Sequence, residues 1–167
     1  MKYDDLSDTS MDDVKAKLIA ALCAEWLAYY QYWWAHITVE GPEGSTESEH
    51  FKKHAEEEKE HIDMLAERMN QLGINPVFSP AELSIKSSCK YPVELENNVA
   101  NEKLLNQIVT AEACAVAVYQ DLLKHLKDDV VTENIVQDIL RKEVEHLSEM
   151  SKELRNIEWY KHVYTKG

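Results

Sequence analysis

The feature that most constrains this chain is a pair of short, nearly identical motifs. Residues 58–61 and 143–146 read Glu-Lys-Glu-His and Glu-Val-Glu-His, each inside a long helix-forming stretch. Because residues three positions apart share one face of a helix, each motif can direct a carboxylate and an imidazole at one point. The motif is weak by itself, since it also joins Glu47 to His50 and is usually a solvated surface pair.

A single glutamate precedes each motif at almost the same distance. Glu25 lies 33 residues before Glu58, and Glu112 lies 31 residues before Glu143, both in apolar surroundings. The two halves of the chain therefore repeat one plan: Glu, turn, Glu-x-x-His. If each half is an antiparallel helix pair, the two glutamates of a half lie about equally far from its turn, so all four carboxylates should meet at the middle of the bundle.

Hydrophobic periodicity and few helix breakers predict an all-α chain. Only four Gly and four Pro occur in 167 residues, which favours long helices in one domain, residues 1–167. The pattern predicts a four-helix bundle with helices over 11–39, 46–72, 95–126 and 130–156. The tail from 157 is predicted to be too short for another long helix. Residues 73–93, with three of the four prolines, form a long crossover between helices two and three, after which the third helix is expected to begin at the same end as the first.

The charge of the chain excludes some classes of function. A formal net charge of −13 argues against direct nucleic-acid binding and suits a protein that attracts cations. No apolar run approaches the length of a membrane span, and no signal peptide opens the sequence. We therefore expect a cytoplasmic protein without membrane association.

Four carboxylates buried at one level need neutralisation, because desolvation and mutual repulsion each cost several kcal/mol. Either protons or two divalent cations can supply it, and two neutral imidazoles complete a ligand set without adding charge. Mixed oxygen and nitrogen donors favour iron or manganese, although zinc also fits. The predicted metal ligands are Glu25, Glu58, His61, Glu112, Glu143 and His146.

These six positions resemble the ferritin superfamily, and specifically bacterioferritins, over about residues 11–156. The closest stretch is residues 139–146, Ile-Leu-Arg-Lys-Glu-Val-Glu-His. The resemblance implies a ferritin-like di-iron domain in which the six residues are the catalytic ligands of two iron ions. Tyr32 and Tyr119, each seven residues after a single Glu, fall where bacterioferritins carry tyrosines beside the metals. They could donate electrons, or they could simply be core residues. Lys59 stands where haem-binding bacterioferritins have Met, so haem is not expected.

Two further features refine the resemblance. The predicted bundle has no fifth helix, as in twelve-subunit Dps-like cages, yet a single chain supplies a whole metal site. Together with Cys89 in the crossover and Cys114 two residues after Glu112, this resembles the Dps-like ferritins called thioferritins. The implied function is oxidation of Fe(II) by hydrogen peroxide or oxygen, and storage of the ferric mineral in a dodecamer that protects against oxidative stress.

The thioferritin resemblance also implies a redox-linked pair of Cys89 and Cys114. Without it, three thiols in a cytoplasmic chain would be read as reduced residues, and Cys23 as a small core residue. Each of three tryptophans could form a contact between subunits or pack in the core, and the sequence leaves this choice open for Trp33, Trp34 and Trp159.

Two other functions fit the same residues. One is a non-storing di-metal peroxidase or catalase of the rubrerythrin or manganese-catalase type. The other is a non-enzymatic bundle whose site holds structural zinc or whose acids are protonated. The native metal, the choice between peroxide and oxygen, a 24-subunit assembly and indirect protection of DNA are left open by the sequence.

Overall fold

The computed structural model describes residues 8–40, 44–91, 101–126 and 128–164. They form five helices and no strand, which confirms the all-α fold class. The helices are α1 (Asp8–Thr38), α2 (Gly44–Gln71), α3 (Pro80–Lys86), α4 (Asn101–Leu123) and α5 (Val130–Tyr164).

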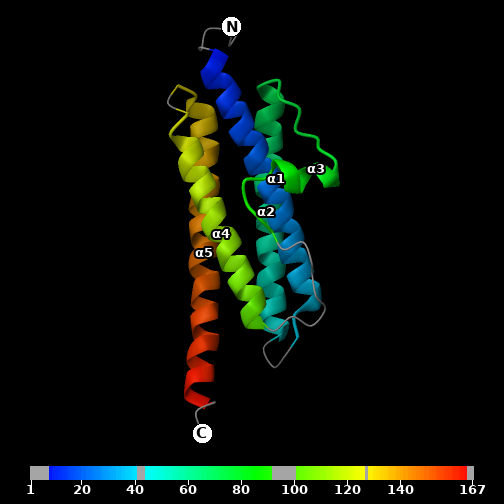
Figure 1. Cartoon of the computed structure of the whole chain (residues 1–167), viewed down its shortest axis with the longest axis vertical. Coiled ribbons are helices and arrows are strands. Elements are labelled where there is room, and N and C mark those ends of the chain that lie inside the picture. The colour runs from blue at the N-terminus through cyan, green and yellow to red at the C-terminus, as the bar shows by residue number, and fades with distance from the viewer. Residues whose placement is uncertain (1–7, 41–43, 92–100, 127, 165–167) are drawn as a thin grey trace.

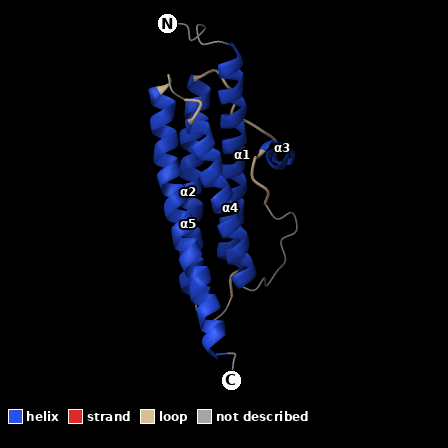
Figure 2. Ribbon diagram, turned by 60° about the vertical axis from the view of Figure 1, so that its left-hand side comes forward, coloured by secondary structure: helices blue, strands red, loops and turns tan. Residues whose placement is uncertain are grey.

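Four long helices form a bundle of two antiparallel pairs, α1 with α2 and α4 with α5 (Figures 1 and 2). Starting from the N-terminus at the top of Figure 1, α1 runs down, α2 up, α4 up and α5 down. The short α3 lies outside the bundle against α1.

The direction of α4 corrects one expectation. Leu104 and Leu105, near the start of α4, pack with Trp34 near the end of α1, so the third long helix does not begin at the same end as the first. The reason is geometric. Because α2 ends beside the start of α1, a third helix beginning there would need only a short turn, whereas the long connection allows the chain to pass to the other end of the bundle.

Local signals explain several helix ends. Gly73 has φ of 74°, the left-handed conformation that terminates α2, and the Ile74 N–H donates to the Met69 carbonyl over 2.8 Å. Asp129 caps α5, since its carboxylate accepts the Thr132 N–H over 3.0 Å. The predicted start of the third helix at residue 95 lies outside the described residues.

Two segments differ from the predicted boundaries. Residues 157–164 continue α5 rather than forming a separate tail, because neither Pro nor Gly interrupts them and Ile157 packs on the core. The crossover contains α3, which begins with Pro80 at its first turn after a capping box of Ser79 and Glu82. A proline in the predicted crossover, Pro80, therefore marks the start of a short helix.

The core is divided into two apolar clusters, one toward each end of the bundle. The first contains Leu18, Leu22, Leu65 and Leu122, and the second contains Phe51, Leu105, Ile108 and Met150, all buried. The predicted metal ligands lie along the helices between these clusters. The apolar clusters therefore supply the burial free energy of the bundle and leave a polar layer at mid-length.

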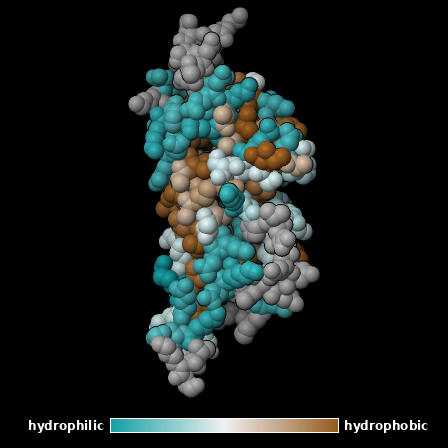
Figure 3. Space-filling view, in the orientation of Figure 1, coloured by the Kyte–Doolittle hydropathy of each residue, from teal (hydrophilic) through white to brown (hydrophobic). Residues whose placement is uncertain are grey.

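The surface is mostly hydrophilic toward the ends of the bundle. Hydrophobic residues gather around α3 and at mid-length of the bundle (Figure 3). None of the described helices combines the length and apolarity needed to cross a bilayer.

Candidate metal centre

The polar layer brings together all six predicted ligands. Glu25 comes from α1, and α4 supplies Glu112; α2 and α5 each supply one Glu-x-x-His pair. None of the six side chains belongs to a residue more than 3% exposed. This meeting point follows from helical spacing, because each motif places its Glu and His one turn apart on the inward face.

The ligands form two overlapping groups of possible metal donors. One group is Glu25, Glu58, His61 and Glu143; the other is Glu58, Glu112, Glu143 and His146. Within each group the donor atoms all lie within 4.8 Å of one another. Glu58 and Glu143 belong to both groups, so their carboxylates are placed to bridge two neighbouring cations.

His61 faces three carboxylates with a single nitrogen. His61 Nδ1 lies 3.2 Å from Glu25 Oε2, 3.2 Å from Glu58 Oε2 and 2.9 Å from Glu143 Oε1. One N–H can satisfy only part of that acceptor set, and the buried Glu112 Oε2 has no hydrogen-bond partner at all. Clustered acceptors with too few donors are what a cation site requires, so these residues fit a pair of metal ions.

Burial and repulsion shift the acidity of the site. Burial, followed by the charge of Glu25, holds the pKa of Glu58 well above its usual range. Burial, followed by the charge of Glu143, does the same to the pKa of Glu112. Burial and the charges of Glu58 and Glu25 raise the pKa of Glu143 to about 8. Without metal, protons therefore neutralise part of the layer, and metal binding has to displace them.

Glu25 behaves differently from the other three acids. Burial acts to raise its pKa, but the hydrogen bond and charge of His61 outweigh burial and lower it. Hydrogen bonds with Glu143, Glu25 and Glu58 raise the pKa of His61 against the effect of its burial. Glu25 and His61 are thus the ion pair of the metal-free site.

Two tyrosines donate hydrogen bonds to the two carboxylates that each belong to only one donor group. The Tyr32 hydroxyl donates to Glu112 Oε1 over 2.5 Å, and the Tyr119 hydroxyl donates to Glu25 Oε1. Burial, followed by the charge of Glu112, keeps the pKa of Tyr32 well above its usual range, so this hydroxyl stays a donor. Both tyrosines lie beside the site, where the resemblance expected them.

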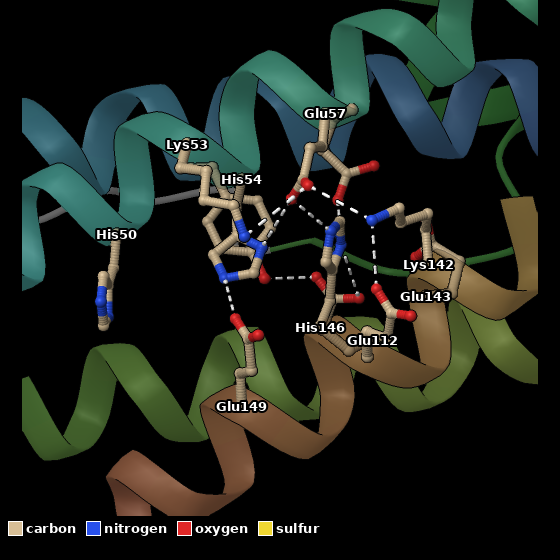
Figure 4. A network of polar contacts seen from close by, with 12 residues as sticks. His50, Lys53, His54, Glu57, Glu112, Lys142, Glu143, His146 and Glu149 are labelled. Atoms are coloured by element: carbon tan, nitrogen blue, oxygen red, sulfur yellow. Dashed lines mark hydrogen bonds and ion pairs between the residues drawn. The ribbon is translucent and has the colours of Figure 1, made fainter.

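Three residues around the site were not predicted. Glu57 Oε2 lies 3.0 Å from His146 Nε2 (Figure 4). His54 is 1% exposed and its ring lies 4.3 Å from that of His146. Burial and then the charges of Glu25 and Glu112 keep the pKa of Tyr91 well above its usual range, so its hydroxyl stays protonated. The sequence does contain a signal for His54, because it precedes Glu58 by one helical turn. It contains no such signal for Glu57 or Tyr91.

The cysteines are connected across the crossover. Cys89 and Cys114 form a disulfide with a Cα–Cα distance of 5.8 Å, which ties the segment before Tyr91 to α4 beside Glu112. Neither cysteine belongs to the groups of possible metal donors found among the described residues. Cys23 is fully buried, and burial raises the pKa of its thiol to about 11, which suits a packing residue.

Known proteins share this architecture. The family model of the ferritin-like domain matches residues 15–159. A "DNA protection during starvation protein" from Pyrococcus furiosus is 29% identical over 130 residues, covering 77% of this chain and 70% of the relative. A structure described as a dodecameric thioferritin, the bacterioferritin-related protein from Bacteroides fragilis, superposes with a TM-score of 0.83 at 35% identity, covering 92% of this chain and 90% of the other.

A more distant structure shares the fold. The Dps protein of Vibrio cholerae, described as a member of a broad superfamily of ferritin-like diiron-carboxylate proteins, has a TM-score of 0.80 at 17% identity, with 92% and 96% of the two chains covered. These similarities confirm the resemblance to the ferritin superfamily and to its Dps-like and thioferritin members. Since the family model spans most of the sequence and the fold agrees with it, the chain belongs to the ferritin-like family.

Proposed function

We propose that this protein oxidises Fe(II) at a di-iron site within each subunit and stores the ferric product in a dodecameric cage, with hydrogen peroxide or oxygen as oxidant. The observation that carries the proposal is the pair of overlapping donor groups that share Glu58 and Glu143, all from one chain. Removal of Fe(II) and peroxide together would protect the cell against oxidative stress.

The six ligands are assigned to two Fe(II) substrates, with two ligands shared by both ions. Glu25 and His61 hold one ion, Glu112 and His146 hold the other, and Glu58 and Glu143 bridge them. Two neighbouring Fe(II) ions can each give one electron to hydrogen peroxide, so that no hydroxyl radical is released. Iron suits the mixed donors, while manganese or zinc could take its place.

Residues beyond the ligands prepare the site for metal. Glu57 is placed to accept the Nε2 proton of His146, which leaves the Nδ1 lone pair for the ion. Tyr32 and Tyr119 fix the outer carboxylates by hydrogen bonds and are close enough to act as electron donors. We assign Cys89 and Cys114 a redox role, because their disulfide ties the crossover to α4 two residues from the ligand Glu112.

The proposed assembly is supported by the similarity to the thioferritin of Bacteroides fragilis, which is described as dodecameric. The net charge of −13 makes direct nucleic-acid binding unfavourable, so any protection of DNA would come from removing peroxide. The cytoplasmic location expected from the sequence stays part of this proposal.

The test is an iron-loading experiment on the purified full-length protein. Fe(II) is added without oxygen, then hydrogen peroxide, and ferric absorbance is followed together with the mass and iron content of the particle. The proposal expects rapid oxidation and a soluble particle that retains iron. A non-storing peroxidase or catalase would consume peroxide without retaining iron, and a structural zinc bundle would do neither. Metal analysis of protein from its own host identifies the native ion.

A further inference from the structure

His54 on α2 has no part in the chemistry proposed above, yet it is buried beside the di-metal site. Its ring is stacked on the ring of Tyr32, with 5.0 Å between the ring centroids and 21° between the planes. The same ring meets that of His146 edge-on, at 4.3 Å and 85° (Figure 4). His54 therefore contacts both a candidate electron donor and a candidate metal ligand.

Hydrogen bonds do little to orient the His54 ring. Its Nδ1 is buried without a hydrogen-bond partner, and its Nε2 lies 3.2 Å from Glu149 Oε2 on a side chain that is 53% exposed. An ion pair with so exposed a carboxylate is weak and does not fix a geometry. The ring contacts with Tyr32 and His146 are the closely packed ones, and offset or edge-to-face ring pairs have preferred orientations.

Tyr32 needs a fixed orientation to act as an electron donor. A tyrosine gives up an electron readily only when its hydroxyl proton can leave with it, and the Tyr32 hydroxyl donates to Glu112 Oε1 over 2.5 Å. Because the hydroxyl lies at the far end of the ring, a small rotation of the side chain would break that hydrogen bond. Two rings of α2, three residues apart, face the Tyr32 ring: Phe51 at 6.3 Å with a tilt of 39°, and the stacked His54.

We infer that His54 is a positioning residue for Tyr32, whose flat face holds the phenol ring at the angle that keeps its hydroxyl on Glu112. His54 also lines a surface pocket between α2 and α5 whose lining does not include Tyr32. The His54 ring therefore separates the electron donor from the contents of that pocket. This inference rests on the proposed function, because it concerns the oxidation of Fe(II) by peroxide.

Tyr32 is needed when a site holds one Fe(II) instead of two. Cleavage of the O–O bond of hydrogen peroxide to give two waters takes two electrons and two protons. Fe(II) gives one electron and becomes Fe(III), and Tyr32 gives the other and becomes a neutral phenoxyl radical. The Tyr32 hydroxyl supplies one proton by way of Glu112, and solvent supplies the other. Fe(II) alone would give one electron and release a hydroxyl radical. His54 is not oxidised and holds the donor in place.

The test adds one Fe(II) per subunit to the full-length protein, then hydrogen peroxide, and records electron paramagnetic resonance spectra of frozen samples. The splitting of a tyrosyl radical by its Cβ protons depends on the angle between the ring and the Cα–Cβ bond, so the spectrum reports the orientation of the ring. Wild type should show one well-defined set of splittings, and Tyr32→Phe should show none. His54→Ala should broaden the splittings and lower the radical formed per iron oxidised by roughly tenfold, the usual scale for losing one supporting group.

Two variants serve as controls. His54→Phe keeps a flat ring and should restore the wild-type yield and splittings. His50→Ala removes an exposed histidine of the same pocket that pairs with Glu153, and it should match the wild type. Counting radicals per iron oxidised separates the positioning of Tyr32 from any loss of metal binding through His146. If His54→Ala does not fold, His54→Leu replaces it, because leucine fills the space without a flat face.

The outcomes separate this inference from the proposed function. Wild-type yield and splittings in His54→Ala would overturn it, as would a loss in His54→Phe as large as that in His54→Ala. A radical that persists in Tyr32→Phe would also overturn it. A wild-type protein that does not oxidise iron contradicts the proposed function instead. In that case the crystal structure of metal-free His54→Ala decides the positioning role, since the Tyr32 hydroxyl should leave Glu112 and an unmoved ring would exclude that role.

Discussion

At the scale of single residues, the layer depends on two carboxylates that each belong to both donor groups. Glu143→Ala should abolish rapid Fe(II) oxidation, because neither ion keeps its full ligand set. His146→Ala should do the same by removing one nitrogen donor. Stopped-flow ferric absorbance measures the rate, and circular dichroism with gel filtration should show an intact helical assembly, since the apolar clusters hold the bundle.

The control for this pair is Glu145→Ala. Glu145 lies on the same helix but is exposed and pairs with Lys142 over 3.1 Å. It should oxidise Fe(II) at the wild-type rate. Full-rate oxidation by both Glu143→Ala and His146→Ala would defeat the ligand assignment.

The acidity of Glu143 predicts how metal binding depends on pH. Its pKa in the metal-free protein is about 8, so below pH 8 the carboxyl is protonated and a cation must displace that proton. Affinity should therefore rise with pH between 6 and 8, by about tenfold per unit for each proton displaced. Calorimetric titration with Co(II) between pH 6 and 8 measures it, and buffers of different ionisation enthalpy count the released protons. A pH-independent affinity would contradict the raised pKa.

At the scale of helices, the start of α5 is fixed by one acidic residue. Asp129 accepts the Thr132 N–H and pairs with Arg68 Nη2 over 2.9 Å, and the Arg68 side chain is 6% exposed. Asp129→Ala should lower the free energy of unfolding by about 1–3 kcal/mol, since the helix loses its cap and a buried guanidinium loses its partner. Denaturant unfolding monitored by circular dichroism measures the loss.

Asp129→Asn is the control, because asparagine caps helices as well as aspartate but cannot pair with Arg68 as an anion. Although burial acts to raise it, the Asp129 pKa is lowered by hydrogen bonds from Thr132 and Arg68. The ionic part of its stabilisation is therefore present above the unfolded value and is lost as pH falls through the folded pKa. The gap between wild type and Asp129→Asn should close below about pH 4. A constant gap would show that the charge is not involved.

A disulfide cross-links the crossover to the bundle. Cys114→Ser should speed amide hydrogen exchange over residues 74–91, because the Cys89–Cys114 disulfide fastens this segment to the side of α4. Exchange in α2 should change little. Mass spectrometry with and without reductant measures it, and Cys23→Ser is the control, since the Cys23 thiol is free and buried elsewhere in the core. Equal protection in reduced and oxidised protein would remove the basis for a redox role.

At the scale of the whole molecule, α1 exposes a row of large apolar side chains. Tyr30, Trp33 and Ile37 are 51%, 44% and 61% exposed and share one helical face. In contrast, Trp34 is in the core, so the open question between core and contact is answered for Trp34, while Trp33 fits a subunit contact. Trp159, 63% exposed near the end of α5, fits one as well.

Trp33→Glu should therefore split the proposed cage into smaller species without unfolding the subunit, because a charge would be buried in the contact. Analytical ultracentrifugation measures the mass, since twelve chains of 19.3 kDa sediment far faster than a dimer. Gln120→Glu, which adds the same charge at an exposed polar position on α4, should stay assembled. A wild-type protein that is monomeric would overturn the dodecamer.

Sequence by itself determined the four long helices of the bundle and the identity of the six inward side chains. Both follow from a local rule, since a 3.6-residue period places Glu and His of each motif on one face and equal distances from a turn bring the two halves of each pair level. That is why Glu25, Glu58, Glu112 and Glu143 could be placed together without coordinates.

Only the tertiary structure decided the direction of the crossover and the surroundings of the ligands. The end of the bundle at which α4 begins depends on packing between α1 and α4, residues far apart in the chain. The surroundings of Glu57, His54 and Tyr91 depend on the distance between helices and on a loop. Neither of these produces a periodic pattern in the sequence from which it could be predicted. Local geometry is repeated along a chain and can be read from it, whereas contacts between distant segments arise only when the whole chain is packed.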